Sequence, residues 1–219
     1  MNELSPTDIE KRSFDIIDEK LLQKGYAPRE HKIVRRIIHA TADFDFADSM
    51  RLHPNAVDNG IAAIRAGKPV ICDARMLQAG LTRLSGPVLC AIGDDEVRQT
   101  AKANGMTRAA TAMQKLSHAF DGAIIAIGNA PTALFKVLEL VKTEGVKPAL
   151  IVGIPVGFVG AAESKEALLE SGLCYITNVG QRGGSPIVAA AMASSGLWVI
   201  MPCFCNLSRI LPEVNPQTI

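Results

Sequence analysis

The fold class of this chain is indicated most clearly by one stretch, Ala123-Ile124-Ile125-Ala126-Ile127-Gly128-Asn129-Ala130-Pro131-Thr132. Its apolar run has no polar alternation, which is typical of a strand buried on both faces. A glycine and an asparagine then mark a turn, and the proline is placed where the first turn of a helix favours it. We expect that helix over Pro131–Glu144. Strand, short turn and helix together form the repeating unit of a parallel α/β sheet.

The same unit recurs on both sides of this stretch. Short apolar runs predict further buried strands at Pro69–Cys72, Val88–Ala91, Ala149–Val152 and Cys174–Thr177. Helical segments are predicted between and after them, at Asp95–Asn104, Arg108–Phe120, Glu163–Ser171 and Pro186–Ser195. This alternation predicts a parallel, doubly wound sheet between two layers of helices, an α/β three-layer sandwich.

The N-terminal third is predicted to be helical. Ser5-Pro6-Thr7-Asp8 is a favourable helix start, and a second helix is expected from Pro28 to Ala42. A third is expected to follow His53-Pro54 and to end at Gly67. We therefore expect a single domain over 1–219. Its parts are a helical segment (1–67), a strand–helix repeat (68–200) and a tail (201–219) that begins after a strand-like run at Trp198.

Composition excludes several classes of function. The net charge is +1 and no long basic run occurs, so nucleic acid is not an expected partner. The N-terminus is polar and no apolar run is long enough to span a membrane, so we expect a cytoplasmic protein. Cys203-Phe204-Cys205 lacks further ligands at zinc spacing, and no dinucleotide or P-loop motif is present. We expect neither a metal nor a cofactor.

Glycine-rich loops follow three of the predicted strands, at 128–132, 153–160 and 178–186. Ligands of open parallel sheets bind at the carboxyl ends of the strands, and helix starts favour anions. Three such loops on one edge could hold several carboxylates or phosphates. The alternative for each loop is a tight turn without a ligand.

His39 is the leading ionisable candidate. It lies at the predicted end of the second helix, where a cation is favoured, so a helix-capping role is one alternative. Arg35 and Arg36 would lower its pKa, whereas Asp43 and Asp45 would raise it. No nucleophile elbow and no H-E-x-x-H motif occurs, so covalent or metal-dependent hydrolysis has little support.

Several stretches together resemble the precorrin-8X methylmutases, also called precorrin isomerases, and their cobalt-precorrin-8 counterparts. The resemblance spans about Asp8 to Ser195. It is carried by Glu10–Phe14, Arg36–Thr41, Cys72–Ala74, Gly80–Arg83, Thr107–Ala110, Ala126–Leu134, Gly153–Lys165 and Arg182–Ser185. The blocks from Gly128 and from Gly153 are too long to match by chance.

The resemblance implies a flavodoxin-like fold, a homodimer with its pocket near the interface, and a cofactor-free reaction. In that reaction a methyl group moves from C-11 to C-12 of precorrin-8X or cobalt-precorrin-8, giving hydrogenobyrinate or cobyrinate for cobalamin. By motif, His39 matches the catalytic acid of the family. Ser13, Arg36, Thr82 and Arg108 match substrate-binding residues, to which we add Asn129 and Gly157.

Two other functions compete with this one. A different α/β protein could bind a phosphorylated or nucleotide ligand on the same glycine edge, although the expected fingerprints are missing. A tetrapyrrole carrier could bind a corrinoid tightly without turnover. The histidine in its matching motif favours the enzyme over the carrier.

Overall fold

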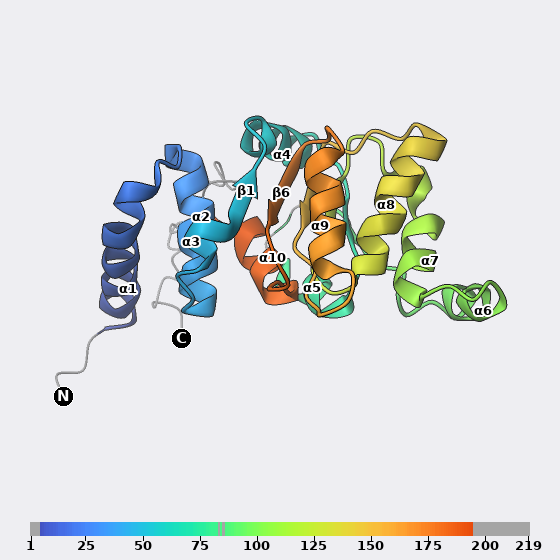
Figure 1. Cartoon of the computed structure of the whole chain (residues 1–219), viewed down its shortest axis with the longest axis horizontal. Coiled ribbons are helices and arrows are strands. Elements are labelled where there is room, and N and C mark those ends of the chain that lie inside the picture. The colour runs from blue at the N-terminus through green and yellow to red at the C-terminus, as the bar shows by residue number, and fades with distance from the viewer. Residues whose placement is uncertain (1–4, 83, 85, 195–219) are drawn as a thin grey trace, which may run out of the picture.

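The computed structural model describes residues 5–82, 84 and 86–194, which form a six-stranded sheet covered by helices (Figure 1). The strands are short and lie in the order β1-β6-β5-β4-β2-β3 across the sheet. They are β1 (Met50–Leu52), β2 (Val70–Cys72), β3 (Val88–Leu89), β4 (Ile124–Ile127), β5 (Leu150–Gly153) and β6 (Tyr175–Asn178).

The helices alternate with the strands from β2 onward, as predicted. They are α1 (Pro6–Leu21), α2 (Pro28–Thr41), α3 (Phe46–Ser49), α4 (Ala56–Arg65), α5 (Arg75–Gly80), α6 (Asp95–Ala103), α7 (Arg108–Lys115), α8 (Pro131–Glu144), α9 (Ala161–Glu170) and α10 (Ser185–Met192). Two 3₁₀ turns, Leu22–Lys24 and Ser117–Ala119, follow α1 and α7.

The strand order confirms the predicted fold class. Strands β2 to β6 are parallel, and numbered from β2 their order in the sheet is 2-1-3-4-5, which is the flavodoxin-like order. β1 pairs antiparallel with β6 at the edge, with Met50 opposite Asn178. The carboxyl ends of β2, β4, β5 and β6 therefore meet at one edge of the sheet.

Side-chain alternation along the strands divides the core into two layers. Val70 and Cys72 of β2 face a cluster that includes residues of α2, α4 and α10. Ile71, between them, faces the opposite cluster of α7, α8 and α9. Both faces are buried, which explains why these strands show no polar alternation.

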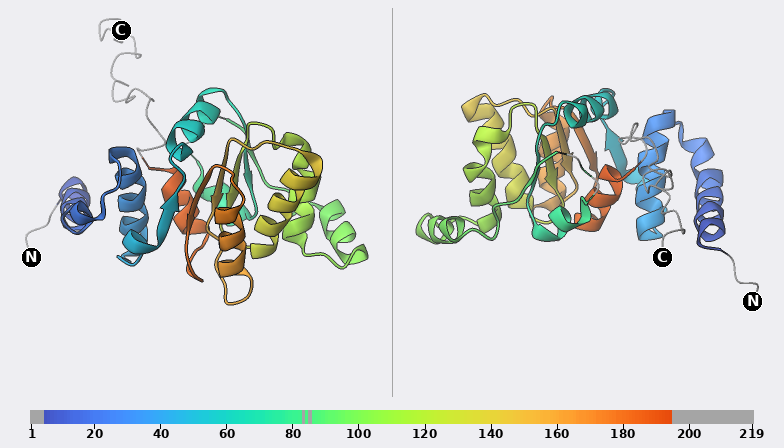
Figure 2. Two further views of the ribbon diagram at one scale, coloured as in Figure 1. Left: turned by 45° about the horizontal axis from the view of Figure 1, so that its top comes forward. Right: turned by 180° about the vertical axis from the view of Figure 1, so that it is seen from behind.

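The helix pair α1–α2 lies beside the sheet rather than on one face of it. α1 is the outermost element and α2 lies between it and the body of the fold, as both Figure 1 and the rear view of Figure 2 show. Ile17 and Leu21 of α1 are buried against α2. The expected N-cap is confirmed, since Ser5 Oγ accepts a hydrogen bond from the backbone N–H of Asp8 at 3.2 Å.

Three elements were not predicted: α3, β1 and α5. β1 corrects the expectation that 1–67 is entirely helical. It has three residues with a charged Arg51 at its centre, so tertiary pairing with β6 rather than local pattern makes it a strand. The helix predicted over Arg108–Phe120 ends at Lys115 and continues as a 3₁₀ turn. Ser195 and the strand-like run from Trp198 lie outside the described residues.

Among the described residues, no helix is long and apolar enough to cross a membrane.

Candidate active site

His39 is held in place by α1. It lies in the last turn of α2, half-buried, with Nδ1 2.9 Å from Ser13 Oγ. The Phe14 ring packs against the imidazole, with centroids 4.9 Å apart and planes inclined by 47°. Ser13 and Phe14 are adjacent residues on α1, so this helix supplies both a polar and an apolar support. The fold thus brings the Ser13 block into contact with the His39 block, a pairing that the sequence did not predict.

The charges that the sequence places around His39 are bound to other groups. Arg35 pairs with Asp18 at 2.8 Å and lies over the Phe14 ring at 4.4 Å from its centroid. Arg36 pairs with Glu10 at 3.1 Å. Asp18 also accepts from His31. Burial raises the pKa of Asp18, but the hydrogen bonds from His31 and Arg35 outweigh it, and the pKa is lowered.

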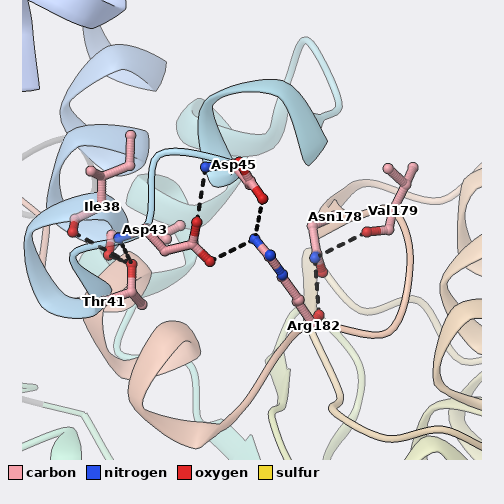
Figure 3. Close-up of polar contacts among 8 residues, drawn as sticks. Ile38, Thr41, Asp43, Asp45, Asn178, Val179 and Arg182 are labelled. Carbon is pink, nitrogen blue, oxygen red and sulfur yellow. Dashed lines mark hydrogen bonds and ion pairs between the residues drawn. The ribbon is translucent and has the colours of Figure 1, made fainter.

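Asp43 and Asp45, which follow α2, both bind the guanidinium of Arg182. Arg182 Nη1 lies 2.7 Å from Asp43 Oδ2 and 2.6 Å from Asp45 Oδ2 (Figure 3). Arg182 comes from the loop between β6 and α10. The two ion pairs thus join the end of the His39 helix to the carboxyl edge of the sheet.

The glycine-rich loops at that edge pack on one another. A Cβ on Gly128 would lie 2.7 Å from Ser185 Cα. A Cβ on Gly183 would overlap the carbonyl oxygens of Ile154 and Pro155. The Gly157 N–H donates to the Gln181 carbonyl at 3.2 Å. For Gly128 and Gly183, close approach of two backbones explains the glycine without a ligand.

The amides of the loop after β4 already bind an anion, and it is the protein's own. Asp73, fully buried at the end of β2, accepts hydrogen bonds from the N–H groups of Gly128, Asn129 and Ala130 at 3.0, 2.8 and 2.7 Å. Burial raises the pKa of Asp73, while the three amides oppose that shift. These three amides are therefore not available for a substrate carboxylate or a phosphate, which favours the alternative of a turn without a ligand for the backbone of this loop.

Lys165 is a second buried ionisable group at the same edge. Its side chain is fully buried, and Nζ donates to Asn178 Oδ1 at 3.1 Å and to the Arg182 carbonyl at 2.7 Å. Burial lowers the pKa of Lys165 to about 8. Sequence reasoning assigned no role to Lys165, Asp73 or Arg182, although each lies in a block that carries the family resemblance.

Three of the remaining predicted residues lie on neighbouring helix starts. Arg108 is the exposed first residue of α7, directly after the N-cap Thr107. Thr107 Oγ1 and Thr132 Oγ1 of α8 are 2.8 Å apart, which brings Arg108 close to the loop that holds the exposed Asn129. A Cβ on Gly160 would lie 3.4 Å from Pro131, so the Gly157 loop adjoins the same start.

Thr82 is exposed just after α5, which packs on α10. α10 in turn packs on α2. Apart from Thr82, the predicted residues form two groups, Ser13–Arg36–His39 on α1–α2 and Arg108–Asn129–Gly157 at the sheet edge. Among the described residues no hydrogen bond or ion pair joins the two groups directly, and α10 with the Arg182 loop lies between them.

The remaining His and Cys side chains are candidate ligands of a metal ion. Within the described part of the chain no group of three or more His, Cys, Asp or Glu side chains could hold a metal. Cys72 is buried and its pKa is raised by burial, which fits an inert core thiol. His53 Nδ1 accepts from the Asn55 N–H, as expected of a turn residue. Cys203 and Cys205 lie outside the described residues.

Residues 8–195 match the model of the precorrin-8X methylmutase family. The chain belongs to this family. It is 44% identical over 198 residues to the cobalt-precorrin-8 methylmutase of Leptospira interrogans, with 84% of this chain and 90% of that protein covered. It is 42% identical over 190 residues to the precorrin-8X methylmutase of Pseudomonas aeruginosa, with 84% and 91% covered.

The fold matches as well as the sequence. A crystal structure of precorrin-8X methylmutase from Thermus thermophilus superposes with a TM-score of 0.76 at 39% identity, covering 84% of this chain and 91% of that one. As a member of the methylmutase family, the chain is an isomerase of cobalamin biosynthesis. The resemblance found in the sequence, and its span, are thereby confirmed.

Proposed function

We propose that this methylmutase moves a methyl group from C-11 to C-12 of precorrin-8X or cobalt-precorrin-8, with His39 as the acid. The product would be hydrogenobyrinate or its cobalt form. The observation that carries the proposal is the 2.9 Å contact between Ser13 Oγ and His39 Nδ1. It assigns one ring nitrogen to the protein and leaves Nε2 for the substrate.

The imidazole has three protonation states that fit this contact, and Nε2 carries a proton in two of them. If Ser13 donates to Nδ1, the neutral ring carries its proton on Nε2. If the ring is an imidazolium, Nδ1 donates to Ser13 and Nε2 also carries a proton. Only a neutral ring protonated at Nδ1 would make Nε2 an acceptor. We take the acid to be one of the two states in which Nε2 carries a proton.

The migration itself needs no external reagent. The bond from the methyl group to C-11 breaks as the bond to C-12 forms, within one conjugated system, and no electrons or atoms enter or leave. A proton or strong hydrogen bond from Nε2 at ring C would stabilise the charge that develops as the methyl group moves. General acid help of this kind contributes about 10²–10⁴-fold.

Carboxylate arms surround the substrate ring, and cationic side chains suit them. Arg108 is exposed and, among the described residues, has no carboxylate within ion-pair distance, so it is free to bind such an arm. Arg36 is bound to Glu10 in an exposed ion pair, and a substrate carboxylate could take the place of Glu10. We assign Arg36, Arg108, Thr82, Asn129 and the Gly157 loop to substrate binding, and Ser13 to the same site through its contact with His39.

We further propose that the protein acts as a homodimer whose pocket includes α1. Ile9 and Ile16 are half-exposed and seven residues apart on this helix, so they share one face. A groove of about 590 Å³ lies between α1 and α3, and none of the predicted site residues lines it. A second copy on α1 would cover this apolar face. Light scattering of the wild type and of Ile16→Glu tests this, with a dimer and a monomer expected respectively.

Incubation with precorrin-8X and with cobalt-precorrin-8 tests the function. Conversion to the visible spectrum of the product supports an enzyme and identifies the form of the substrate. Tight binding without a spectral change would instead support the carrier. Binding of a nucleotide has little support, because Asp73 fills the anion site at the point where the strand order reverses.

A further inference from the structure

Lys165 is a buried cation without a carboxylate partner. Its relative exposure is 0%, and within the described residues no carboxylate oxygen lies within 4.0 Å of Nζ. Its hydrogen-bond acceptors are two neutral oxygens, Oδ1 of Asn178 and the carbonyl of Arg182. A buried ammonium is costly, and an apolar side chain of similar size would stabilise a core more. Stability alone therefore does not account for lysine at this position.

The two residues that accept hydrogen bonds from Lys165 are also hydrogen-bonded to each other. Asn178 Nδ2 donates to the same Arg182 carbonyl at 2.9 Å and to the Val179 carbonyl at 3.3 Å. Asn178 ends β6 and Arg182 lies four residues further on (Figure 3). One ammonium on α9 thus fixes both the start and the middle of the β6–α10 loop.

The side chain of Arg182 in the same loop is held by the segment that follows α2. The Arg182 guanidinium binds Asp43 and Asp45, but it is 56% exposed, and exposed pairs are individually weak. The buried contacts of the Arg182 carbonyl are the firmer support. Lys165 thereby fixes the position of the loop. It also fixes the position from which the Arg182 guanidinium reaches Asp43 and Asp45.

We propose that Lys165 is a positioning residue that fixes the β6–α10 loop against α2 and so shapes the part of the site that binds the carboxylate arms of the substrate. The proposal rests on the proposed function. Lys165 acts through Asn178 and Arg182 and does not itself touch the substrate.

Lys165→Met tests the proposal, because methionine keeps the length and removes the donor. We expect KM for precorrin-8X to rise about tenfold, the effect of losing one anchoring hydrogen bond, with kcat within about threefold of wild type. Lys165→Arg retains donors and should return KM to within about threefold of wild type, whatever its melting temperature. A wild-type KM in Lys165→Met would overturn the proposal.

Leu168→Ala is the matched control. Leu168 is fully buried on the same helix, so its loss lowers the melting temperature through a cavity but leaves the loop contacts intact. KM should stay near the wild-type value. Equal KM increases in Leu168→Ala and Lys165→Met would show a general loss of stability and refute a positioning role.

A double-mutant cycle uses the contacts of Arg182 with Asp43 and Asp45. In an Asp43→Asn/Asp45→Asn background, Lys165→Met should add little to KM if all three residues fix the same loop, whereas additive effects on KM count against it. If Lys165→Met does not fold, Asn178→Ala removes one of the two hydrogen bonds of Nζ together with the Asn178–Arg182 hydrogen bond, and a wild-type KM there overturns the proposal. The result for His39 is independent, because it concerns kcat rather than KM.

Discussion

Ser13 Oγ lies 2.9 Å from Nδ1 of His39, across the interface between α1 and α2. The contact joins residues that are 26 positions apart in the sequence. It makes the outermost helix of the fold part of the candidate site, because α1 determines which ring nitrogen of His39 remains available.

Ser13→Ala should lower kcat about tenfold, the effect of losing one hydrogen bond that orients the acid. KM should change little, since no carboxylate anchor is removed. Steady-state kinetics with precorrin-8X measures both, and Ser13→Thr, which keeps a hydroxyl group, should retain most of the activity. Full kcat in Ser13→Ala would mean that the contact does not orient the imidazole.

Asp73→Ala should destabilise the fold by about 3 kcal/mol, because three backbone N–H groups lose their acceptor. It should also create an anion site that the wild type lacks. We expect inorganic phosphate to raise the melting temperature of Asp73→Ala in a concentration-dependent manner and to leave the wild type unchanged. An Asp73→Ala melting temperature that ignores phosphate would contradict our account of this loop.

The stability of the wild type should increase between about pH 8 and 10.5, the folded and ordinary pKa values of Lys165. In this window the unfolded chain still holds a proton that the folded chain has released, so the free energy of unfolding rises with pH. The rise should exceed that of Lys165→Met by about 1–3 kcal/mol. Urea unfolding of both proteins at several pH values measures it, and parallel pH curves would contradict burial of the charge.

Arg108→Ala should weaken corrinoid binding about tenfold at low salt, because a charge-assisted contact to a carboxylate arm is lost. The difference from wild type should shrink as ionic strength rises. Fluorescence or absorbance titration at two salt concentrations measures it. Arg98→Ala is the control, since Arg98 is an exposed arginine that pairs with Asp95 on α6. Unchanged affinity of Arg108→Ala at low salt would remove Arg108 from the site.

The fold was largely predictable because its strands are buried on both faces. Runs such as Ile124–Ile127 are apolar throughout, which predicts burial on both faces from composition alone. Pro6, Pro28 and Pro131 each mark the first turn of a helix in the local sequence. β1 was missed because its three residues become a strand only by pairing with β6, more than 120 positions away.

The site was less predictable, since its contacts join distant segments. Glycine-rich loops indicated an anion-binding edge, but the sequence could not show that Asp73 fills one loop from 55 positions away. Nor could it show that Asp43 and Asp45 turn toward Arg182 rather than act on His39. The motif of His39 made this residue the leading candidate for the acid, whereas the contact with Ser13 depends on the packing of α1 on α2.

His39→Ala tests whether His39 is the acid. His118→Ala is the control, because His118 is exposed and its ring contacts the carbonyl of Lys115 in the preceding turn. Stopped-flow absorbance with precorrin-8X gives the rate of conversion, and titration with the product gives Kd. We predict that His39→Ala lowers kcat by about 10²–10⁴-fold, as loss of a general acid requires, while Kd stays within about threefold. Conversion by His39→Ala at the wild-type rate would contradict the assignment of His39 as the acid.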